Sequence, residues 1–223
     1  MSDFVVYNMD VFDGLKRMQD GGVLVDCILT SPPYWGLRDY GVEGQIGLEE
    51  HPQQYVDKLV RVFRESKKVL KDTGSLWLNL GDSFYSKSGS GKGSNFKERH
   101  EQLDNGRGKL TEMHHKIRGK FNDGGWLQPK QKLLIPHRVA IALQEDGWVL
   151  RNDVVWSKPN YMPSSVQDRL TTSFEFVFHF VKKQKYYYDL DSIRVPHKTS
   201  IEKINKRIEY DTKRKNWNWR LVY

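Results

Sequence analysis

The chain has 223 residues, of which 38% are hydrophobic and 29% charged, and its formal net charge is +8. This length and composition suit one globular α/β domain better than two. No apolar run approaches the roughly 20 residues of a membrane-spanning helix, and Met1-Ser2-Asp3 does not begin a secretion signal. We therefore expect a cytoplasmic protein and exclude a membrane or secreted one.

The positive charge is concentrated in two segments. Residues 86–135 hold eleven Lys and Arg against five Asp and Glu, and residues 198–223 hold eight against three. Such segments are typical of proteins that bind a polyanion, because phosphate contacts supply most non-specific affinity for nucleic acids. The alternative, that these segments are only solvated loops, stays open.

A strand, a helix and a second strand are expected at the start of the chain. The pattern predicts a short strand over Phe4–Tyr7, a helix over Val11–Met18 and a buried strand over Val23–Leu29. Asp10 precedes the helix, where it either caps the first turn or serves a functional role. Cys27, the single cysteine, is expected to be a small core residue with no role as a nucleophile.

The second strand runs into Thr30-Ser31-Pro32-Pro33-Tyr34-Trp35. Proline has no backbone donor, so the strand is expected to end at Ser31. The carboxyl ends of strands in an open α/β sheet form the crevice where ligands bind, which makes Ser31 and Tyr34 candidate site residues. The alternative is an ordinary proline-capped strand end. Trp35 either lines the same pocket or packs under the following loop.

Downstream, the pattern predicts a loop, helices and further strands. The loop over residues 36–47 is expected to be a mobile lid. The other predicted elements are a helix over 53–70 with Gly74 just past its end, a strand over 75–80, a helix over 135–145, and strands over 148–156, 174–181 and 186–189. Their order predicts a mostly parallel sheet that finishes in an antiparallel pair.

A long insertion over about residues 85–131 interrupts these elements. It is rich in Gly, Lys, Asn and Ser and has no sustained periodicity, so we expect it to face DNA. His114 and His115 lie in it without a Cys or carboxylate at ligand spacing, and no metal site is expected.

The Thr30–Trp35 segment resembles the catalytic motif of the DNA amino methyltransferases, which transfer a methyl group from S-adenosylmethionine to an exocyclic base nitrogen. Ser-Pro-Pro-Tyr is similar to the motif of the cytosine-N4 branch, whereas adenine-N6 enzymes more often carry Asp or Asn in place of Ser31. Similarity to the circularly permuted, beta-type branch extends over roughly residues 4–197, through Trp156–Asn160, Met162-Pro163, Asp168–Thr171, Phe174-Glu175, Tyr187–Asp189 and Ile193-Arg194.

This resemblance implies a class I methyltransferase fold, a Rossmann-like sheet with one antiparallel strand. It implies a catalytic domain over residues 1–197 and a basic tail over 198–223 that begins a target-recognition region. The family's Phe-x-Gly-x-Gly loop after a strand is absent, since the Gly-rich residues 88–94 follow a polar loop. The first two strands of the sheet are therefore expected to be missing, as in a truncated enzyme, a split enzyme or a domain with a partner chain.

The resemblance also implies roles for individual residues. The catalytic set is Ser31, Pro32, Pro33 and Tyr34: Tyr34 stacks on a flipped base, and Ser31 Oγ and the Pro32 carbonyl accept the hydrogens of the target amine. Asp10 is expected to bind the adenine of S-adenosylmethionine. The expected DNA contacts are Lys92, Arg99, Lys116, Arg118 and Lys158, and Trp156 either joins them or lies in the core.

The expected function is therefore methylation of cytosine N4 in double-stranded DNA, in a restriction-modification setting with a possible restriction endonuclease partner. Two alternatives stay open. One is adenine-N6 methylation, and the other is a catalytically silent DNA-binding fragment that needs a complementing chain.

Overall fold

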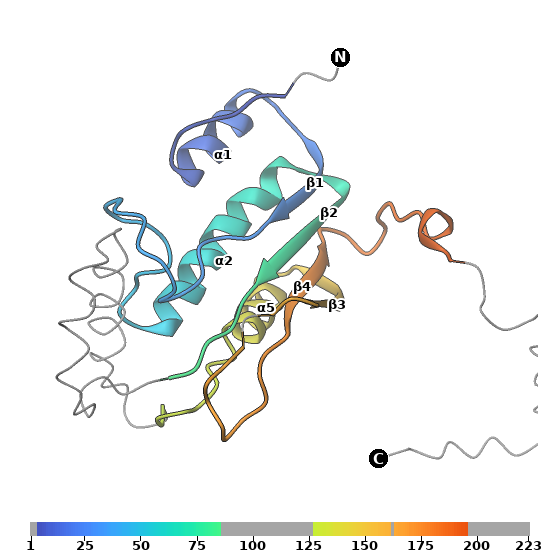
Figure 1. The fold of residues 1–223 in the computed structure, drawn as a ribbon. Helices are drawn as coiled ribbons and strands as arrows, with labels where there is room; N and C mark the ends of the chain where they lie inside the picture. The colour runs from blue at the N-terminus through green and yellow to red at the C-terminus, as the bar shows by residue number, and fades with distance from the viewer. Residues whose placement is uncertain (1–3, 86–126, 162, 196–223) are drawn as a thin grey trace, which may run out of the picture. The chain divides into compact units, whose positions relative to one another are not determined.

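The computed structural model describes residues 4–85, 127–161 and 163–195. Its principal unit is a mixed α/β sheet of four strands in the order β1-β2-β4-β3 (Figure 1). The elements are α1 (Val11–Asp20), β1 (Val25–Thr30), α2 (Pro52–Val69), β2 (Leu70–Leu80), α5 (Ile135–Glu145), β3 (Val149–Ser157), β4 (Phe174–Val181) and the 3₁₀ turn η2 (Asp191–Ile193). The predicted helix over 135–145 and the predicted strand over 174–181 are confirmed with their bounds. The bounds of the other five elements that were predicted correctly differ from the predicted ones by one to five residues.

The sheet is mixed, with one parallel and two antiparallel pairings among the described strands. β1 pairs with β2 in parallel, with Ile28 opposite Leu76. β4 is antiparallel to both of its neighbours, with Phe178 opposite Leu78 of β2 and opposite Asp153 of β3. β1, β2 and β3 therefore run in one direction and β4 in the other.

The core lies between one face of this sheet and the helices α2 and α5, which pack against each other (Figure 1). Alternate residues of β2 point to this face because side chains in a strand alternate between its two sides. Leu76, Leu78 and Leu80 are almost fully buried there, against Tyr55 and Leu59 of α2. Burying this apolar surface is the main force that holds the sheet and the two helices together.

Helix α1 lies beside α2 and buries none of its residues completely. The Gln19 side-chain amide donates to the Glu65 carboxylate of α2 at 3.2 Å, and the Arg61 guanidinium lies 5.6 Å from the centre of the Phe12 ring. Polar and cation–π contacts thus contribute to the attachment of α1 to α2.

Two predicted strands are absent from the described residues. Phe4–Tyr7 is irregular and exposed, with Phe4 88% and Val6 81% accessible. Residues 186–189 are also irregular, although the Tyr187 amide donates to the Thr73 carbonyl at 3.0 Å. Both predictions were wrong because a strand needs a hydrogen-bonded neighbour as well as a suitable composition.

Gly74 lies inside β2, so the prediction that it follows the end of the helix was wrong. α2 ends at Val69, and β2 begins at once with Leu70. Between Leu70 and Ser75 the register with β1 shifts, so this part of β2 bulges. A Cβ at position 74 would lie 2.8 Å from the Asp26 carbonyl oxygen, so glycine is needed for the close approach of the two strands.

Cys27 is exposed, which contradicts the prediction of a core residue. Its neighbour Leu29 is also 77% accessible. Within the described residues β1 pairs with β2 alone and is an edge strand. Apolar composition predicted burial here, but no described element covers this side of β1.

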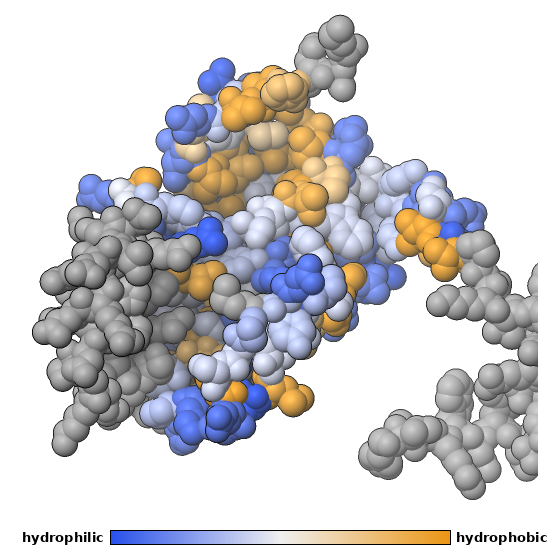
Figure 2. Space-filling model, viewed as in Figure 1, coloured by the Kyte–Doolittle hydropathy of each residue, from blue (hydrophilic) through white to orange (hydrophobic). Residues whose placement is uncertain are grey.

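Hydrophobic residues gather on the surface over α1 and β1, as Figure 2 shows. Those more than 40% accessible there are Phe4, Val5, Val6, Tyr7, Met9, Val23, Leu24 and Leu29. We call this set the β1-edge patch. Exposed apolar patches of this extent are typical of surfaces that another polypeptide covers.

A second unit begins at Tyr188, and its described residues are 188–195. In it the Asp189 carboxylate accepts a hydrogen bond from the Ser192 amide at 3.2 Å, which helps to form η2. The predicted domain boundary at 197 lies outside the described residues. In the ranges that the structure describes, no helix is both long and apolar enough to cross a membrane.

Candidate functional site

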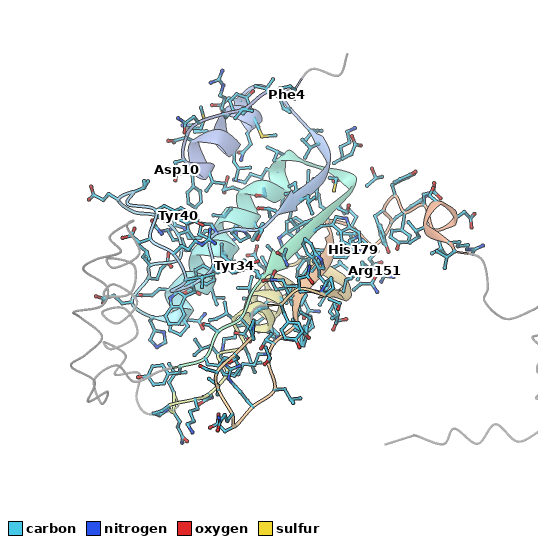
Figure 3. All side chains as sticks on the ribbon, in the orientation of Figure 1. Phe4, Asp10, Tyr34, Tyr40, Arg151 and His179 are labelled. Carbon is cyan, nitrogen blue, oxygen red and sulfur yellow. The ribbon has the colours of Figure 1, made fainter. Side chains whose placement is uncertain are left out.

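The Pro-Pro segment begins where β1 ends. β1 stops at Thr30, one residue before the predicted end. Ser31 is exposed, and Pro32, Pro33 and Tyr34 are partly buried. Since β2 runs parallel to β1, the carboxyl ends of both strands lie at the same edge of the sheet. Figure 3 shows Tyr34 just beyond this end of β1.

The Tyr34 hydroxyl connects the Pro-Pro segment to two other strands. It lies 2.8 Å from Asn79 Oδ1 on β2 and 3.2 Å from Glu175 Oε2 on β4. Ser31 Oγ lies 3.2 Å from the same hydroxyl and 3.3 Å from Asn79 Oδ1. The Asn79 amide nitrogen donates to the Phe176 carbonyl at 3.2 Å, which orients the amide oxygen toward Ser31 and Tyr34.

Gly81 provides the space for the Tyr34 ring. A Cβ at position 81 would lie 2.5 Å from Tyr34 Cε2 and 2.8 Å from Cδ2, which is closer than non-bonded carbons approach. Burial raises the pKa of the Tyr34 hydroxyl, the Ser31 hydrogen bond lowers it, and the negative charge of Glu175 raises it again. With a pKa raised above its usual value, this phenol is neutral at physiological pH and acts as a hydrogen-bond donor.

Glu175 forms an ion pair with Lys158. The ammonium group contacts Oε1, while Oε2 is the oxygen near Tyr34. The Glu175 side chain is 19% exposed and that of Lys158 is 41% exposed. The predicted DNA contact of Lys158 stays a prediction, and the structure assigns its ammonium group a partner within the protein.

Tyr55 of α2 holds the Pro-Pro segment from the core side. Its side chain is fully buried, and its hydroxyl donates to the Pro33 carbonyl at 2.9 Å. Burial raises the pKa of this hydroxyl strongly, and the charge of Glu49 adds to the effect, so Tyr55 also stays a donor. The Pro32 carbonyl, which is predicted to accept from the substrate, directly precedes the Pro33 carbonyl that Tyr55 binds.

Trp35 packs under the following loop, as one of its two interpretations predicted. It is 3% exposed, and its indole nitrogen donates to the Glu49 carbonyl at 3.0 Å. The Glu49 carboxylate accepts from the Gly47 amide at 2.9 Å and pairs with Lys58 at 3.3 Å. These contacts fasten the end of the loop to α2. The mobility of residues 36–47 stays a prediction.

The loop also borders an open pocket of about 460 Å³, lined in part by Asp39, Glu43, Glu49 and Lys58. Neither Ser31 nor Tyr34 belongs to its lining. The pocket is therefore separate from the hydrogen-bond cluster around Tyr34.

The two ends of the basic insertion meet near this cluster. The Tyr85 amide donates to the Gln131 carbonyl at 2.7 Å, and Phe84 and Lys132 form an antiparallel bridge. Phe84 and Tyr85 follow the carboxyl end of β2 by a few residues, and these contacts bring Gln131 and Lys132 beside them. The insertion thus leaves and rejoins the sheet at the edge that carries Tyr34.

The other predicted site residues lie apart from the cluster or outside the description. Asp10 caps α1, because its Oδ1 accepts from the Phe12 amide at 2.8 Å, and the capping interpretation is confirmed. Its cofactor role stays a prediction. Trp156 is 57% exposed on β3, which excludes the core alternative. Lys92, Arg99, Lys116 and Arg118 lie outside the described residues.

Sequence reasoning missed Asn79, Gly81 and Tyr55 as parts of the site. Asn79 is a polar residue in an apolar strand, near the carboxyl end, and that position was a usable signal. The sequence marks Gly81 as the end of a strand, but it does not indicate the contact with the Tyr34 ring. Tyr55 has the helical spacing of an ordinary core residue, and nothing in the sequence marks its contact with Pro33.

Comparison with known families matches residues 25–222 to the family model described as DNA methylase. The chain belongs to this DNA methylase family. The match includes the whole Ser31–Tyr34 segment, both of its partner residues Asn79 and Glu175, and Lys158.

Type II methyltransferases are among the relatives of this chain. It is 43% identical over 210 residues to M.SfiI of Streptomyces fimbriatus, a match that covers 94% of this chain and 43% of the relative. It is 44% identical over 189 residues to M.Cfr9I of Citrobacter freundii, covering 85% and 58%. The chain therefore spans about half the length of these curated relatives.

Among solved structures, the PvuII DNA methyltransferase, described as cytosine-N4-specific, matches with a TM-score of 0.46 at 16% identity. The match covers 85% of this chain and 58% of that one.

Proposed function

We propose that this chain is the base-handling part of a site-specific methyltransferase that transfers a methyl group from S-adenosylmethionine to cytosine N4 in double-stranded DNA. The observation that carries the proposal is the Ser31-Pro-Pro-Tyr34 segment at the carboxyl end of β1, with its hydroxyls tied to Asn79 and Glu175. Serine at position 31 favours cytosine over adenine through the resemblance to the cytosine-N4 motif.

The protein's task is to hold a flipped base and its amine. The amino group of cytosine is a poor nucleophile because its lone pair is delocalised into the ring. Ser31 donates its proton inward, toward Asn79 or Tyr34, so its oxygen keeps lone pairs to accept an amine hydrogen. The Pro32 carbonyl accepts the second hydrogen, and the fixed φ of each proline holds it in place beforehand.

Tyr34 supplies the stacking surface for the base. One side of its ring rests against Gly81, and the single hydrogen of its hydroxyl is shared between two acceptors on different strands. A base would stack on the opposite side of the ring, an interaction worth about 1–3 kcal/mol. Orienting the reactants in this way is the main contribution that such a site makes to the rate.

The described residues supply part of a site for S-adenosylmethionine, which provides an electrophilic methyl group when bound. The Asp10 carboxylate uses Oδ1 for the cap of α1, and Oδ2 would accept the adenine amino group. The glycine loop that holds the methionine end in the resembling family is not in this sequence. The β1 edge is where further strands would dock, because β1 pairs on one side only within the described residues.

We therefore propose that additional polypeptide covers the β1-edge patch and carries the glycine loop. It is either more of the same chain or a complementing chain. A chimera in which this chain replaces the matching segment of M.Cfr9I would supply it, and we refer to this protein below as the chimera.

Cofactor binding and the methylated product test the proposal. The chain and the chimera are each titrated with S-adenosylmethionine to measure cofactor binding. Each is then incubated with the cofactor and DNA, and the DNA is digested to nucleosides that mass spectrometry identifies. N4-methylcytosine from the chimera is the expected product. N6-methyladenine would transfer the assignment to the adenine branch. DNA binding with neither product would instead favour a silent DNA-binding fragment.

A restriction endonuclease of the same sequence specificity is the proposed biological partner. Cells that express the chimera should then contain DNA that resists one such endonuclease. DNA that stays sensitive to every endonuclease tested would argue against a role in restriction-modification.

A further inference from the structure

The Lys158–Glu175 ion pair has no part in the mechanism described so far, although it contacts the site directly. Glu175 is the second residue of β4, and Lys158 follows the last residue of β3. The Lys158 amide donates to the Ser173 carbonyl at 2.7 Å, so the backbone holds the two side chains side by side. The pair is therefore built into the antiparallel β3–β4 ladder.

The ion pair contacts the hydroxyl of Tyr34, which is the part of the side chain farthest from the backbone. Asn79 and Glu175 approach the hydroxyl from different strands, at 2.8 and 3.2 Å. Gly81 lies against the ring itself. A ring contacted in this way at its face and at its tip has little freedom to rotate about χ1 or χ2. The phenol has one hydrogen, which it shares between these two acceptors. A hydrogen bond to an ionised carboxylate is roughly twice as strong as one between neutral groups, so the share that goes to Glu175 contributes to this restraint.

Lys158 reduces the free-energy cost of placing the Glu175 carboxylate at this poorly solvated position. With the Glu175 side chain only 19% exposed, a charge without a partner would be costly, and the ammonium group compensates it. The cation also keeps the net charge beside Tyr34 close to zero. Glu175 can then accept from the phenol without placing an uncompensated negative charge at the edge that receives DNA.

We propose that Glu175 and Lys158 are positioning residues that hold the Tyr34 ring ready for the target base. The inference rests on the proposed function, because Tyr34 is the stacking residue of that mechanism. It assigns to Lys158 a role inside the site in place of the predicted contact with DNA.

Titration of Tyr34 in the chain itself tests the ion pair without cofactor or DNA. Tyrosine labelled with ¹³C at Cζ gives one NMR signal per residue, and Tyr34→Phe identifies the signal of Tyr34. In Glu175→Gln the pKa of Tyr34 should fall, because a neighbouring negative charge that raises it is gone. In Lys158→Met it should rise, because that charge is no longer compensated.

Opposite shifts in the two variants separate this role from a general loosening of the site. Loosening would expose Tyr34 to solvent and lower its pKa in both variants, and that result would overturn the proposal. Glu145→Gln is the matched control, because Glu145 is exposed at the far end of α5, and it should leave the Tyr34 signal unchanged. If Glu175→Gln does not fold, the direction in which the pKa of Tyr34 changes in Lys158→Met still distinguishes the two interpretations.

Turnover in the chimera supplies the second readout. Glu175→Gln should lower kcat on the order of 10- to 100-fold, since misplacing a positioning group by about 1 Å costs that much, and should leave the KM for DNA unchanged. Glu175→Asp keeps the charge and should recover part of the lost rate. A raised KM with normal kcat would contradict positioning. If the parent chimera methylates nothing, the proposed function fails, while the Tyr34 titration still decides the role of the pair.

Discussion

The Tyr34 ring fills the space that a side chain at position 81 would need. In Gly81→Ala the new methyl group would overlap the Tyr34 ring, with 2.5 Å to Cε2, so the ring must move. We expect a loss of kcat on the order of 100-fold in the chimera. Overpacking of this kind typically costs about 1–3 kcal/mol in the free energy of unfolding, measured by urea titration.

Gly14→Ala is the matched control for this substitution. A Cβ at position 14 meets nothing closer than 3.8 Å, and Gly14 lies inside α1. It should stabilise the chain by about 0.5–1 kcal/mol and leave the rate unchanged. Equal rates in both variants would show that the position of the Tyr34 ring does not matter.

Ser31 can be tested by removing its hydroxyl alone. Ser31→Ala abolishes the contacts with Tyr34 and Asn79 and the proposed acceptor of an amine hydrogen. The kcat of the chimera should fall on the order of 100-fold, with a modest change in DNA affinity measured by fluorescence anisotropy. Ser31→Thr keeps a hydroxyl and should retain much of the activity. Normal turnover of Ser31→Ala would refute the assigned role.

At the scale of elements, the Tyr55 hydroxyl connects α2 to the Pro-Pro segment. Tyr55→Phe removes the donor to the Pro33 carbonyl and leaves that acceptor unsatisfied, which costs about 1–3 kcal/mol in the free energy of unfolding. We also expect a lower kcat, because the neighbouring Pro32 carbonyl loses its support. Tyr40→Phe, at a residue that is 58% exposed on the loop, should change neither quantity.

The pairing of β2 with β4 buries a histidine whose ionisation affects stability. His179 is 1% exposed and stacks on Trp77 with ring centres 4.1 Å apart. Burial lowers its pKa, and the positive charge of Arg151 lowers it further. Below about pH 6.5 the unfolded chain therefore binds a proton that the folded chain does not. The contribution of His179 to stability is complete above that pH and is lost as the pH falls through the lowered pKa.

His179→Phe should remove this part of the acid sensitivity. As the pH falls below about 6.5, the free energy of unfolding of the parent should decrease more steeply than that of the variant, by at most about 1.4 kcal/mol per pH unit. Urea titration at several pH values measures this difference. Parallel pH profiles for the two proteins would contradict the assignment.

How well the sequence predicted each element depended on where the information lies. The helices and β4 follow from periodicity, which short stretches of chain carry by themselves. The strand predicted over Phe4–Tyr7 failed because pairing depends on residues elsewhere. In the site, the motif predicted Ser31 and Tyr34, whereas the contact of Tyr34 with Glu175 joins positions 141 residues apart.

At the scale of the whole molecule, the basic segments should govern DNA affinity. Residues 86–135 carry eleven Lys and Arg, and each phosphate contact contributes about 0.9 to the slope of log K against log salt concentration. Lys116→Gln with Arg118→Gln should therefore reduce that slope by about 1–2, measured by anisotropy at several salt concentrations. Lys68→Gln is the control, because Lys68 pairs with Glu65 on α2, at 2.7 Å. An unchanged slope in the double variant would argue against DNA contacts by these two residues.

The sequence alone determined the α/β class, most element positions and the motif at the end of β1, because composition, periodicity and missing proline donors act locally. Tertiary structure decided which partners that motif has. Asn79, Glu175 and Tyr55 lie on β2, β4 and α2, and they meet Ser31, Pro33 and Tyr34 only when the strands pair and the helix packs. It also decided that Cys27 and Leu29 are exposed, since burial depends on a covering element and not on composition.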